Sequence, residues 1–348
     1  ERQDALAQFG LSVNLPRMKT DLERYKIHYD TWFYESTLHE SGYVAETVDL
    51  LTEKGWTYEK DGALWLKTAD ILRDHFRKQG KKEADIEKLD LKDDVLRRAN
   101  GFYTYFAADI AYHRNKLEKR GFSKAVNIWG ADHHGHVARL QAALDGLGLD
   151  GSHRLVVVLM QLVNLLQDGK PVRMSKRSGK AIALHDLLDE ISVDAARYFF
   201  NSRSSNSPLD FDLDLAVRED SDNPVYYVQY AHARICSLIA KLAEEGAAVP
   251  AAGDVDAALL VQPEEKALLK ALSMLPEEIR LAARDYDPSR INRYLVELSG
   301  DFHRFYNACR IREEAPALRD ARLKLADTTR AVIAGGLGLL GVSAPEKM

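Results

Sequence analysis

The spacing of apolar residues near the start of the chain changes from a helical to a strand-like period. Residues 43–51 carry apolar side chains on one helical face, and Gly55 follows where a helix end favours glycine. Apolar and polar residues then alternate over residues 56–66, on both sides of Asp61-Gly62. Because Asp-Gly between alternating runs is a strong hairpin signal, we predict a helix followed by a β-hairpin.

Charged residues dominate two segments on either side of this pattern. Residues 17–24 indicate a charged helix, and Lys, Glu and Asp make up most of residues 77–94. A run of charge of this kind is usually a solvated surface. We therefore expect residues 77–94 to form an exposed, mobile insertion, and residues 1–120 as a whole to mix helices with short extended pieces.

The middle of the chain shows a strand, a helix and a second strand in sequence. An apolar run at residues 125–129 predicts a buried parallel strand, residues 136–147 have apolar positions at helical spacing, and residues 155–160 are rich in β-formers. This order is typical of an α/β fold with a doubly wound sheet. Because ligands of such sheets bind beyond the carboxyl ends of the strands, the residues that follow position 129 are candidates for a site.

The pattern becomes helical from Asn223-Pro224 to the end. It is interrupted only at a few loops or helix ends, which lie at residues 246–253, Pro276, Asp287-Pro288 and Ala315-Pro316. A helical bundle of about 125 residues has the size of one domain. We therefore predict a partial α/β domain over residues 1–222 and an all-helical domain over residues 223–348.

Composition limits the classes of protein that fit this pattern. Of the 348 residues, 46% are hydrophobic and 29% are charged, which is typical of a globular protein. The formal net charge of −5 means that any nucleic acid would have to be bound by local basic patches. Cys236 and Cys309 are the only cysteines, which excludes a cysteine-rich zinc site and favours a reducing compartment. No apolar run is long enough to span a membrane, so we expect a cytoplasmic protein without membrane contact.

A cationic loop follows an apolar segment that ends at Asp168-Gly169. Its sequence, residues 172–180, is Val-Arg-Met-Ser-Lys-Arg-Ser-Gly-Lys. Such a loop can close over a polyphosphate, where Lys176 would meet the charge that develops on departing phosphates. A solvated basic turn carries the same charge. Charge alone favours that simple turn, and only the order Met174-Ser175-Lys176 argues for a catalytic loop.

The segment Gly-Ala-Asp-His-His-Gly-His, residues 130–136, directly follows the predicted strand at residues 125–129. A metal cluster is one interpretation, but the residues are too nearly adjacent for all their side chains to reach one ion. Residues 133–136 also match the letters of the His-x-Gly-His motif of nucleotidyltransferases, but that motif opens the first helix of its fold, far upstream of a Met-Ser-Lys loop. A glycine-containing strand end before a helix N-terminus favours a third interpretation, a contact with nucleotide and substrate.

Tyr105 and Asp109 are four residues apart in a helical segment, a spacing that places both side chains on one face. A carboxylate beside an aromatic ring is a natural receptor for a guanidinium, through a bidentate salt link and cation–π stacking. Periodicity alone favours the simpler alternative of a surface aspartate and a core tyrosine. Glu35, which follows Trp32-Phe33-Tyr34, is a further acid among aromatic residues and on its own indicates nothing specific.

Tyr227, Tyr230 and Arg234 fall on one face of a predicted helix in the second domain. Aromatic rings with an arginine on one face can stack unpaired bases and hold phosphates. Tyrosines packed into a bundle with their polar tips outward are an equally good interpretation of each one alone.

These segments together closely resemble arginyl-tRNA synthetases of the bacterial type, over nearly all of the chain. The resemblance consists of several long motifs in the same order, at residues 29–36, 104–112, 130–135, 173–179, 194–200 and 210–216. The helical part resembles the family's anticodon-binding domain as far as Met348. The implied fold is the C-terminal half of a class I synthetase Rossmann-like nucleotide-binding domain, followed by a helical anticodon-binding domain of the DALR type.

The resemblance implies a role for each candidate residue in the α/β part. Catalysis at the departing pyrophosphate of ATP would use the loop residues Met174, Ser175 and Lys176. The pocket for ATP and arginine would be lined by Gly130, Asp132 and His133. The arginine guanidinium would be bound by Tyr105 and Asp109, and Glu35 would help to hold the amino acid.

The resemblance also implies the partners. Contacts with the anticodon loop of tRNA(Arg) would come from Tyr227, Tyr230, Arg234 and Met348. The reaction would form arginyl-adenylate from ATP and L-arginine and then transfer the arginyl group to the terminal ribose of the tRNA. Mg²⁺ would accompany ATP, no protein metal site is expected, and the intact enzyme would be a monomer.

Two departures from the family pattern affect these expectations. Arg173 and Arg177 stand where the family loop Lys-Met-Ser-Lys-Ser has its first lysine and its last serine, so the role of that serine is in doubt. The chain begins at Glu1 and lacks a counterpart of the family's first catalytic half and N-terminal domain. We therefore expect a fragment with exposed apolar surface on half a sheet, which does not activate arginine alone.

Other classes fit the sequence less well. A cysteinyl enzyme has a related helical domain but reads its substrate with a cysteine-rich zinc site, which two isolated cysteines cannot build. A plain nucleotidyltransferase has no need for the helical domain. A non-catalytic tRNA-binding protein derived from a synthetase stays open as an alternative.

Overall fold

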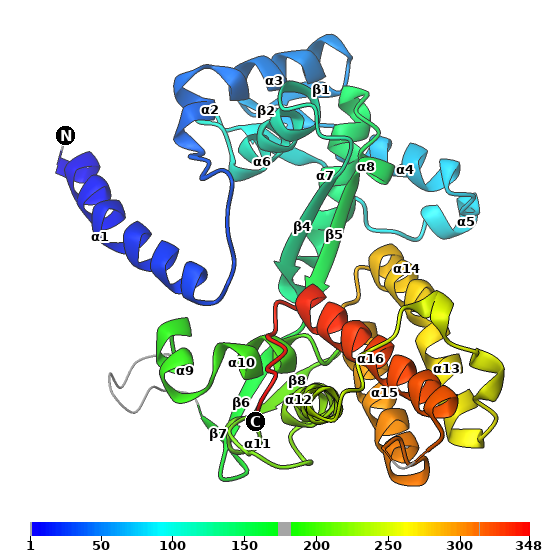
Figure 1. Cartoon of the computed structure of the whole chain (residues 1–348). Helices are drawn as coiled ribbons and strands as arrows, with labels where there is room; N and C mark the ends of the chain where they lie inside the picture. The colour runs from blue at the N-terminus through cyan, green and yellow to red at the C-terminus, as the bar shows by residue number, and fades with distance from the viewer. Residues whose placement is uncertain (1, 173–181, 313) are drawn as a thin grey trace. The chain divides into compact units, whose positions relative to one another are not determined.

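The computed structural model of the protein describes residues 2–172, 182–312 and 314–348. The predicted loop residues Met174, Ser175 and Lys176 lie outside the described residues. The chain forms two compact units (Figure 1). The inserted unit comprises residues 29–162, and the discontinuous unit comprises residues 1–28 together with 163–348.

Helices and short strands alternate in the inserted unit. They are α2 (Ser36–Glu40), α3 (Tyr43–Glu53), β1 (Thr57–Lys60), β2 (Ala63–Leu66), α4 (Thr68–Lys78), α5 (Glu83–Ile86), β3 (Asp94–Arg97), α6 (Tyr105–Arg114), the π-helical turn η1 (Asn115–Lys119), β4 (Ala125–Gly130), the 3-10 turn η2 (Ala131–His133), α7 (His134–Leu147), α8 (Gly151–Arg154) and β5 (Leu155–Met160). The predicted helix at 43–51 is α3, and the predicted hairpin is β1–β2, which pairs antiparallel. Asp61 and Gly62 have φ of 51° and 74°, the left-handed backbone that a tight hairpin turn requires.

Residues 77–94 are not wholly an exposed insertion. Ile86 of α5 is 1% exposed, so this short helix is packed into the unit. Asp93 accepts hydrogen bonds from the Tyr58 hydroxyl and the Ala69 amide, each 3.0 Å long. The expectation was wrong at these positions because a run of charge conceals single apolar residues that pack inward.

The strand predicted at residues 125–129 is β4, and it pairs in parallel with β5 in register from Ala125 with Leu155 to Gly130 with Met160. The helix between them, α7, completes the expected strand–helix–strand order. β4 is buried on one face only, because Val126 and Ile128 are 45% and 71% exposed. The prediction of a buried strand was wrong for that face, and the exposed apolar surface expected of half a sheet is present.

The discontinuous unit contains a small mixed sheet and the helical bundle. Its elements are α1 (Arg2–Arg24), β6 (Val163–Gln167), β7 (Lys170–Val172), α9 (Leu184–Glu190), α10 (Val193–Phe200), β8 (Leu209–Asp212), α11 (Leu213–Ala216), α12 (Pro224–Glu244), the 3-10 turns η3 (Ala252–Asp254) and η4 (Ala257–Leu259), α13 (Pro263–Ser273), α14 (Leu275–Asp285), α15 (Ser289–Ala308) and α16 (Pro316–Leu339). β6 pairs antiparallel with β7 and parallel with β8. Proline lies in the first turn of α12, α13, α14 and α16, where its missing amide costs no helical hydrogen bond. The helical character predicted after residue 223 is confirmed.

A buried ion pair joins α13 to α16 in the core of the bundle. Glu265 is 0% exposed and accepts a 2.6 Å hydrogen bond from Arg322 Nε, while Arg322 itself is 5% exposed. The Arg322 guanidinium also donates to Glu314 and to the backbone oxygen of Arg310. The buried Arg322 side chain therefore links α13 to α16 and also holds the connection between α15 and α16.

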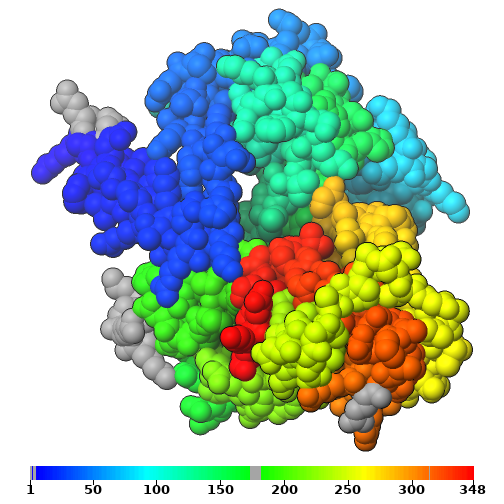
Figure 2. Space-filling view, viewed as in Figure 1, coloured from blue at the N-terminus to red at the C-terminus, as the bar shows by residue number. Residues whose placement is uncertain are grey.

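The chain after α16 returns along its own unit as an extended tail. Backbone atoms of this tail are bonded to side chains of α10 and α12, at Ser343 and Pro345. The tail is drawn in red beside the green α10 and α12 in Figure 1, and Figure 2 shows that it lies on the surface.

Candidate functional sites

The first candidate site lies at the carboxyl end of β4, where the predicted segment 130–136 folds into η2 and the start of α7. A Cβ added to Gly130 would lie 2.5 Å from Asp132 Oδ1, so a larger residue would displace that carboxylate. The Asp132 and His133 side chains are 81% and 59% exposed, and Asp132 Oδ2 lies 3.7 Å from His133 Nε2. An exposed carboxylate and imidazole thus stand beside the amino end of a long helix, which attracts anions.

Asp109 is paired with a histidine that the sequence pattern does not connect to it. His136 Nε2 lies 3.0 Å from Asp109 Oδ2, and the two side chains are 21% and 39% exposed. The His136 ring also contacts Trp129 and Phe106, with ring centroids 5.5 and 5.4 Å away. The start of α7 and the middle of α6 are therefore joined, and the carboxylate of Asp109 remains partly open to a cationic ligand.

Tyr105 lies one helical turn before Asp109 on α6, and Glu35 lies directly before α2. Tyr105 opens α6 and is 83% exposed, so the alternative of a core tyrosine is wrong. Glu35 precedes α2, which packs against α6, and its carboxylate lies 3.9 Å from His39 Nε2. The structure brings Asp109 and His136 together, with the exposed Tyr105 one helical turn before Asp109, whereas Glu35 is paired with His39.

Among the described residues, no group of three or more histidine, cysteine, aspartate or glutamate side chains is arranged to hold a metal ion.

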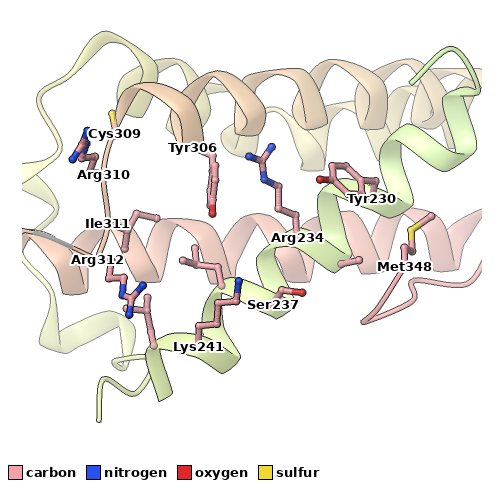
Figure 3. Close-up of a pocket in the computed structure, with 13 residues that line it drawn as sticks. Tyr230, Arg234, Ser237, Lys241, Tyr306, Cys309, Arg310, Ile311, Arg312 and Met348 are labelled. Carbon is pink, nitrogen blue, oxygen red and sulfur yellow. The ribbon is translucent and has the colours of Figure 1, made fainter. Parts of the chain in front are cut away.

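The second candidate site is a groove in the discontinuous unit, with a volume of about 600 Å³. We call it the α12–α15 groove. It is lined by Tyr230, Ala233, Arg234, Ser237, Leu238, Lys241, Leu242, Tyr306, Cys309, Arg310, Ile311, Arg312 and Met348. Figure 3 shows Tyr230 and Met348 at one end, Arg310 and Arg312 at the other, and Arg234 beside Tyr306 between them. Aromatic and cationic side chains therefore alternate along one surface.

Ring stacking organises the centre of the α12–α15 groove. The Arg234 guanidinium lies 4.1 Å from the centroid of the Tyr306 ring, and Arg234 Nη1 lies 3.4 Å from His303 Nδ1. Burial, and to a smaller extent the charge of Arg234, lower the pKa of His303 to about 4. His303 is therefore neutral near pH 7 and can accept a hydrogen bond from Arg234. The neutral ring packs on Tyr227 and Tyr230, with centroids 5.1 and 6.0 Å away.

The four residues predicted to meet an anticodon do not all occupy the groove. Tyr230, Arg234 and Met348 line it, whereas Tyr227 packs on His303 beside it. Tyr230 is 41% and Met348 52% exposed, so both can be reached by a ligand. Met348 joins residues of α12 although more than a hundred residues separate them in the sequence.

Several residues of both sites were not singled out from the sequence. His136 belongs to the segment 130–136, but its pairing with Asp109 was not predicted, because nothing local in the sequence links the two residues. Lys241 and Tyr306 could have been predicted from the sequence. Lys241 continues the helical spacing of Arg234 along α12, and Tyr306 repeats an aromatic face on α15. Arg310 and Arg312 lie in an irregular connection, where no period exists to predict them.

Comparison with known proteins identifies the family. Residues 17–220 match the family described as tRNA synthetases class I (R), catalytic domain, and residues 228–348 match the DALR anticodon binding domain. The chain belongs to the class I arginyl-tRNA synthetase family. The fold predicted from the sequence, a class I catalytic part followed by a helical DALR domain, is confirmed.

Individual relatives agree with this family. The arginine–tRNA ligase of Ruminiclostridium cellulolyticum is 52% identical over 348 residues, which is 100% of this chain and 58% of that protein. A Campylobacter jejuni structure assigned as an arginyl-tRNA synthetase superposes with a TM-score of 0.85 at 34% identity, over 99% of this chain and 70% of that one. The Thermus thermophilus arginyl-tRNA synthetase has the same fold, with a TM-score of 0.81 at 21% identity, over 99% of this chain and 65% of that one. The chain thus spans a little over half the length of the curated arginine–tRNA ligases that it matches.

Within the described part of the chain, no helix combines the length and apolar character that crossing a bilayer requires.

Proposed function

We propose that the chain is the catalytic and anticodon-binding portion of an arginine–tRNA ligase. The arginine carboxylate attacks the α-phosphorus of ATP, pyrophosphate leaves, and arginyl-adenylate forms. The terminal ribose hydroxyl of tRNA(Arg) then attacks the activated carbonyl, and AMP leaves. The observation that carries the proposal is the 52% identity, over the whole chain, to an arginine–tRNA ligase. The proposal assigns adenylate formation to residues 1–222 and recognition of the tRNA to residues 223–348.

In this proposal the arginine guanidinium binds at Asp109. The carboxylate is partly exposed, and its Oδ2 lies 3.0 Å from His136 Nε2. A guanidinium is a stronger partner than an imidazole because it is always charged and can donate two parallel hydrogen bonds. Tyr105, exposed one helical turn earlier, supplies a ring face for stacking, and Glu35 contacts the α-amino group of the substrate.

ATP is proposed to bind at the carboxyl end of β4. Gly130 allows the nucleotide to approach the backbone, and Asp132 and His133 offer polar contacts beside the amino end of α7. Lys176, with Met174 and Ser175, stabilises the charge on the departing pyrophosphate. Mg²⁺ enters with ATP, since this ion is usually held by one or two carboxylates together with substrate phosphates.

The α12–α15 groove is proposed to bind the anticodon loop of tRNA(Arg). Exposed Tyr230 provides a stacking surface for an unpaired base, while Arg234 and Lys241 meet the backbone phosphates. Local cationic residues suit this role because the chain as a whole has a net charge of −5. We further propose that the intact enzyme is a cytoplasmic monomer.

Arginine-dependent exchange between ATP and pyrophosphate, measured with tRNA(Arg) present, tests the catalytic part. The chain alone should give no exchange. A chimera that adds the preceding part of the Ruminiclostridium cellulolyticum enzyme should restore it. In that chimera Asp109→Asn should raise the KM for arginine at least tenfold, whereas Asp49→Asn, at an exposed position of α3, should not.

The outcomes separate the two candidate functions. Exchange by the chain alone at the rate of an intact enzyme would contradict the expectation that it is incomplete. An inactive chimera that nevertheless binds tRNA(Arg) would favour the non-catalytic tRNA-binding protein.

A further inference from the structure

The sequence motif at residues 194–200 has no role in the proposed chemistry, yet its first residue, Asp194, is hydrogen-bonded to Ser343 in the tail that follows α16. Asp194 lies in the first turn of α10, and its Oδ2 accepts hydrogen bonds from the Ser343 amide (3.1 Å) and the Ser343 hydroxyl. Gln229 of α12 donates both to Asp194 Oδ2 (3.1 Å) and to the Ser343 carbonyl (3.0 Å). Lys26 Nζ lies 2.9 Å from Asp194 Oδ1 and neutralises its charge.

Arg197, one turn later, holds the start of the same tail. Its Nε donates to the Leu340 carbonyl at 2.8 Å, and its Nη1 donates to the Tyr25 carbonyl at 2.8 Å. Gly341 has a φ of +70°, and a Cβ at this position would collide with the Arg197 guanidinium. The tail can therefore turn onto α10 only because this residue is glycine.

Beyond this anchor the tail leads directly to the α12–α15 groove. His232 Nδ1 lies 2.9 Å from the Pro345 carbonyl, and Met348, three residues further on, lines the groove. Leu340 and Val342 are buried, so the tail is fixed by packing up to the anchor. Over residues 343–348, the polar contacts described for the tail backbone come from Asp194, Gln229 and His232.

We propose that Asp194 is a positioning residue for RNA binding, which acts by holding residues 343–345 on α10 and α12 so that Met348 stays in the groove. Arg197 and Gly341 set the direction in which the tail leaves α16. The proposal rests on the proposed role of the groove in binding the anticodon loop, but the anchoring of the tail can be measured without RNA.

The positioning role predicts that Asp194 and the tail act as one unit. The dissociation constant for an RNA stem-loop with the tRNA(Arg) anticodon would be measured for four chains: the unsubstituted chain, Asp194→Ala, a chain ending at Val342, and the chain with both changes. Asp194→Ala should weaken binding about tenfold, as expected for the loss of a charge-assisted hydrogen bond. It should have no further effect in the shortened chain, because changes that share one pathway are not additive.

Asp189→Ala is the matched control. Asp189 lies five residues before Asp194 and forms a 2.7 Å ion pair with Arg24 near the end of α1. This ion pair resembles the pair of Asp194 with Lys26, but it joins α9 to α1 and belongs to neither α10 nor α12. The control should leave RNA binding unchanged. Ser343→Ala, which removes only the hydroxyl donor, should give a smaller loss in the same direction if Asp194→Ala folds poorly.

Nuclear magnetic resonance of the methionine methyl groups reports on the anchor directly. The protein has 5 methionines, so the Met348 signal can be assigned with Met348→Leu. In Asp194→Ala this signal should sharpen and move toward the random-coil position, and in Asp189→Ala it should not. An unchanged signal in Asp194→Ala, or a tenfold loss of affinity that persists in the shortened chain, would overturn the proposal. If the unsubstituted chain does not bind the stem-loop, the proposed groove function fails, and the methyl signal still decides whether Asp194 anchors the tail.

Discussion

Removal of the Glu265 carboxylate should destabilise the discontinuous unit strongly. Glu265 is fully buried and accepts hydrogen bonds from Arg322 Nε (2.6 Å) and from the Gln262 amide (2.8 Å). In Glu265→Ala the Arg322 guanidinium stays buried without its main counter-charge, which typically costs about 3 to 5 kcal/mol. Because Glu314 and the Arg310 carbonyl still accept from Arg322, we expect a loss near the lower end, about 3 kcal/mol.

This loss converts into a measurable shift in melting temperature. For a unit of about 200 residues, 1 kcal/mol corresponds to roughly 2 to 4 °C, so Glu265→Ala should melt about 6 to 12 °C lower. Far-ultraviolet circular dichroism follows the whole chain. Tryptophan fluorescence follows the inserted unit alone, because that unit contains all of Trp32, Trp56, Trp65 and Trp129. The dichroism transition should therefore shift more than the fluorescence transition.

Two further variants test the contribution of the Glu265–Arg322 pair to stability. Glu264→Gln changes the neighbouring glutamate, for which no ion pair is described, and should shift the melting temperature by less than about 2 °C. Glu265→Leu combined with Arg322→Met removes both charges and should be more stable than the sum of the single changes predicts. A melting temperature of Glu265→Ala within about 2 °C of the parent would show that the pair is not a buried unit of stability.

Three other expectations follow from single groups. Burial raises the pKa of the Asp194 carboxyl, but hydrogen bonds from Ser343 and Lys26 outweigh it and hold this pKa below its usual range. The anchor should therefore stabilise the fold above about pH 4 and be lost as the pH falls further, which a pH titration of the Met348 methyl signal would follow; release near pH 6 would contradict it. Burial and Arg120 lower the pKa of Lys116 to about 8, so an amine-reactive reagent read by mass spectrometry should label it with a midpoint near that pH; a midpoint above pH 10 would refute this. Lys241→Gln should reduce the slope of log Kd against log salt for the stem-loop by about 0.7, the value for one phosphate contact on a single strand, whereas Lys266→Gln on α13 should leave it unchanged.

The sequence predicted those parts of the fold that depend on local patterns. The hairpin at Asp61-Gly62 and the helix at residues 43–51 follow from periods and turn residues a few positions apart. Burial of the strand at residues 125–129 was wrong on one face, because an apolar run does not reveal what covers each side. Ile86 was overlooked for the same reason, since its burial depends on neighbours that are distant in sequence.

The candidate sites likewise combine features that local sequence patterns predict with features that depend on packing between distant segments. The spacing of Tyr105 and Asp109 was enough to place them on one helix, but the pairing of Asp109 with His136 depends on how α6 packs on α7. The role of Met348 was predicted only from the family resemblance. Its position in the groove is set by Asp194 and Gly341, and no local pattern contains that information.

The hydrogen bond between Lys26 and the tail has a consequence for the order in which the chain can fold. Lys26 Nζ donates to the Gly341 carbonyl, a partner 315 positions later, so this contact cannot form until Gly341 has been synthesised. The inserted unit is continuous in sequence and can fold as soon as it leaves the ribosome, before the partners of residues 1–28 exist. Its folding shortens the effective loop that the later contact must close, which reduces the entropic cost.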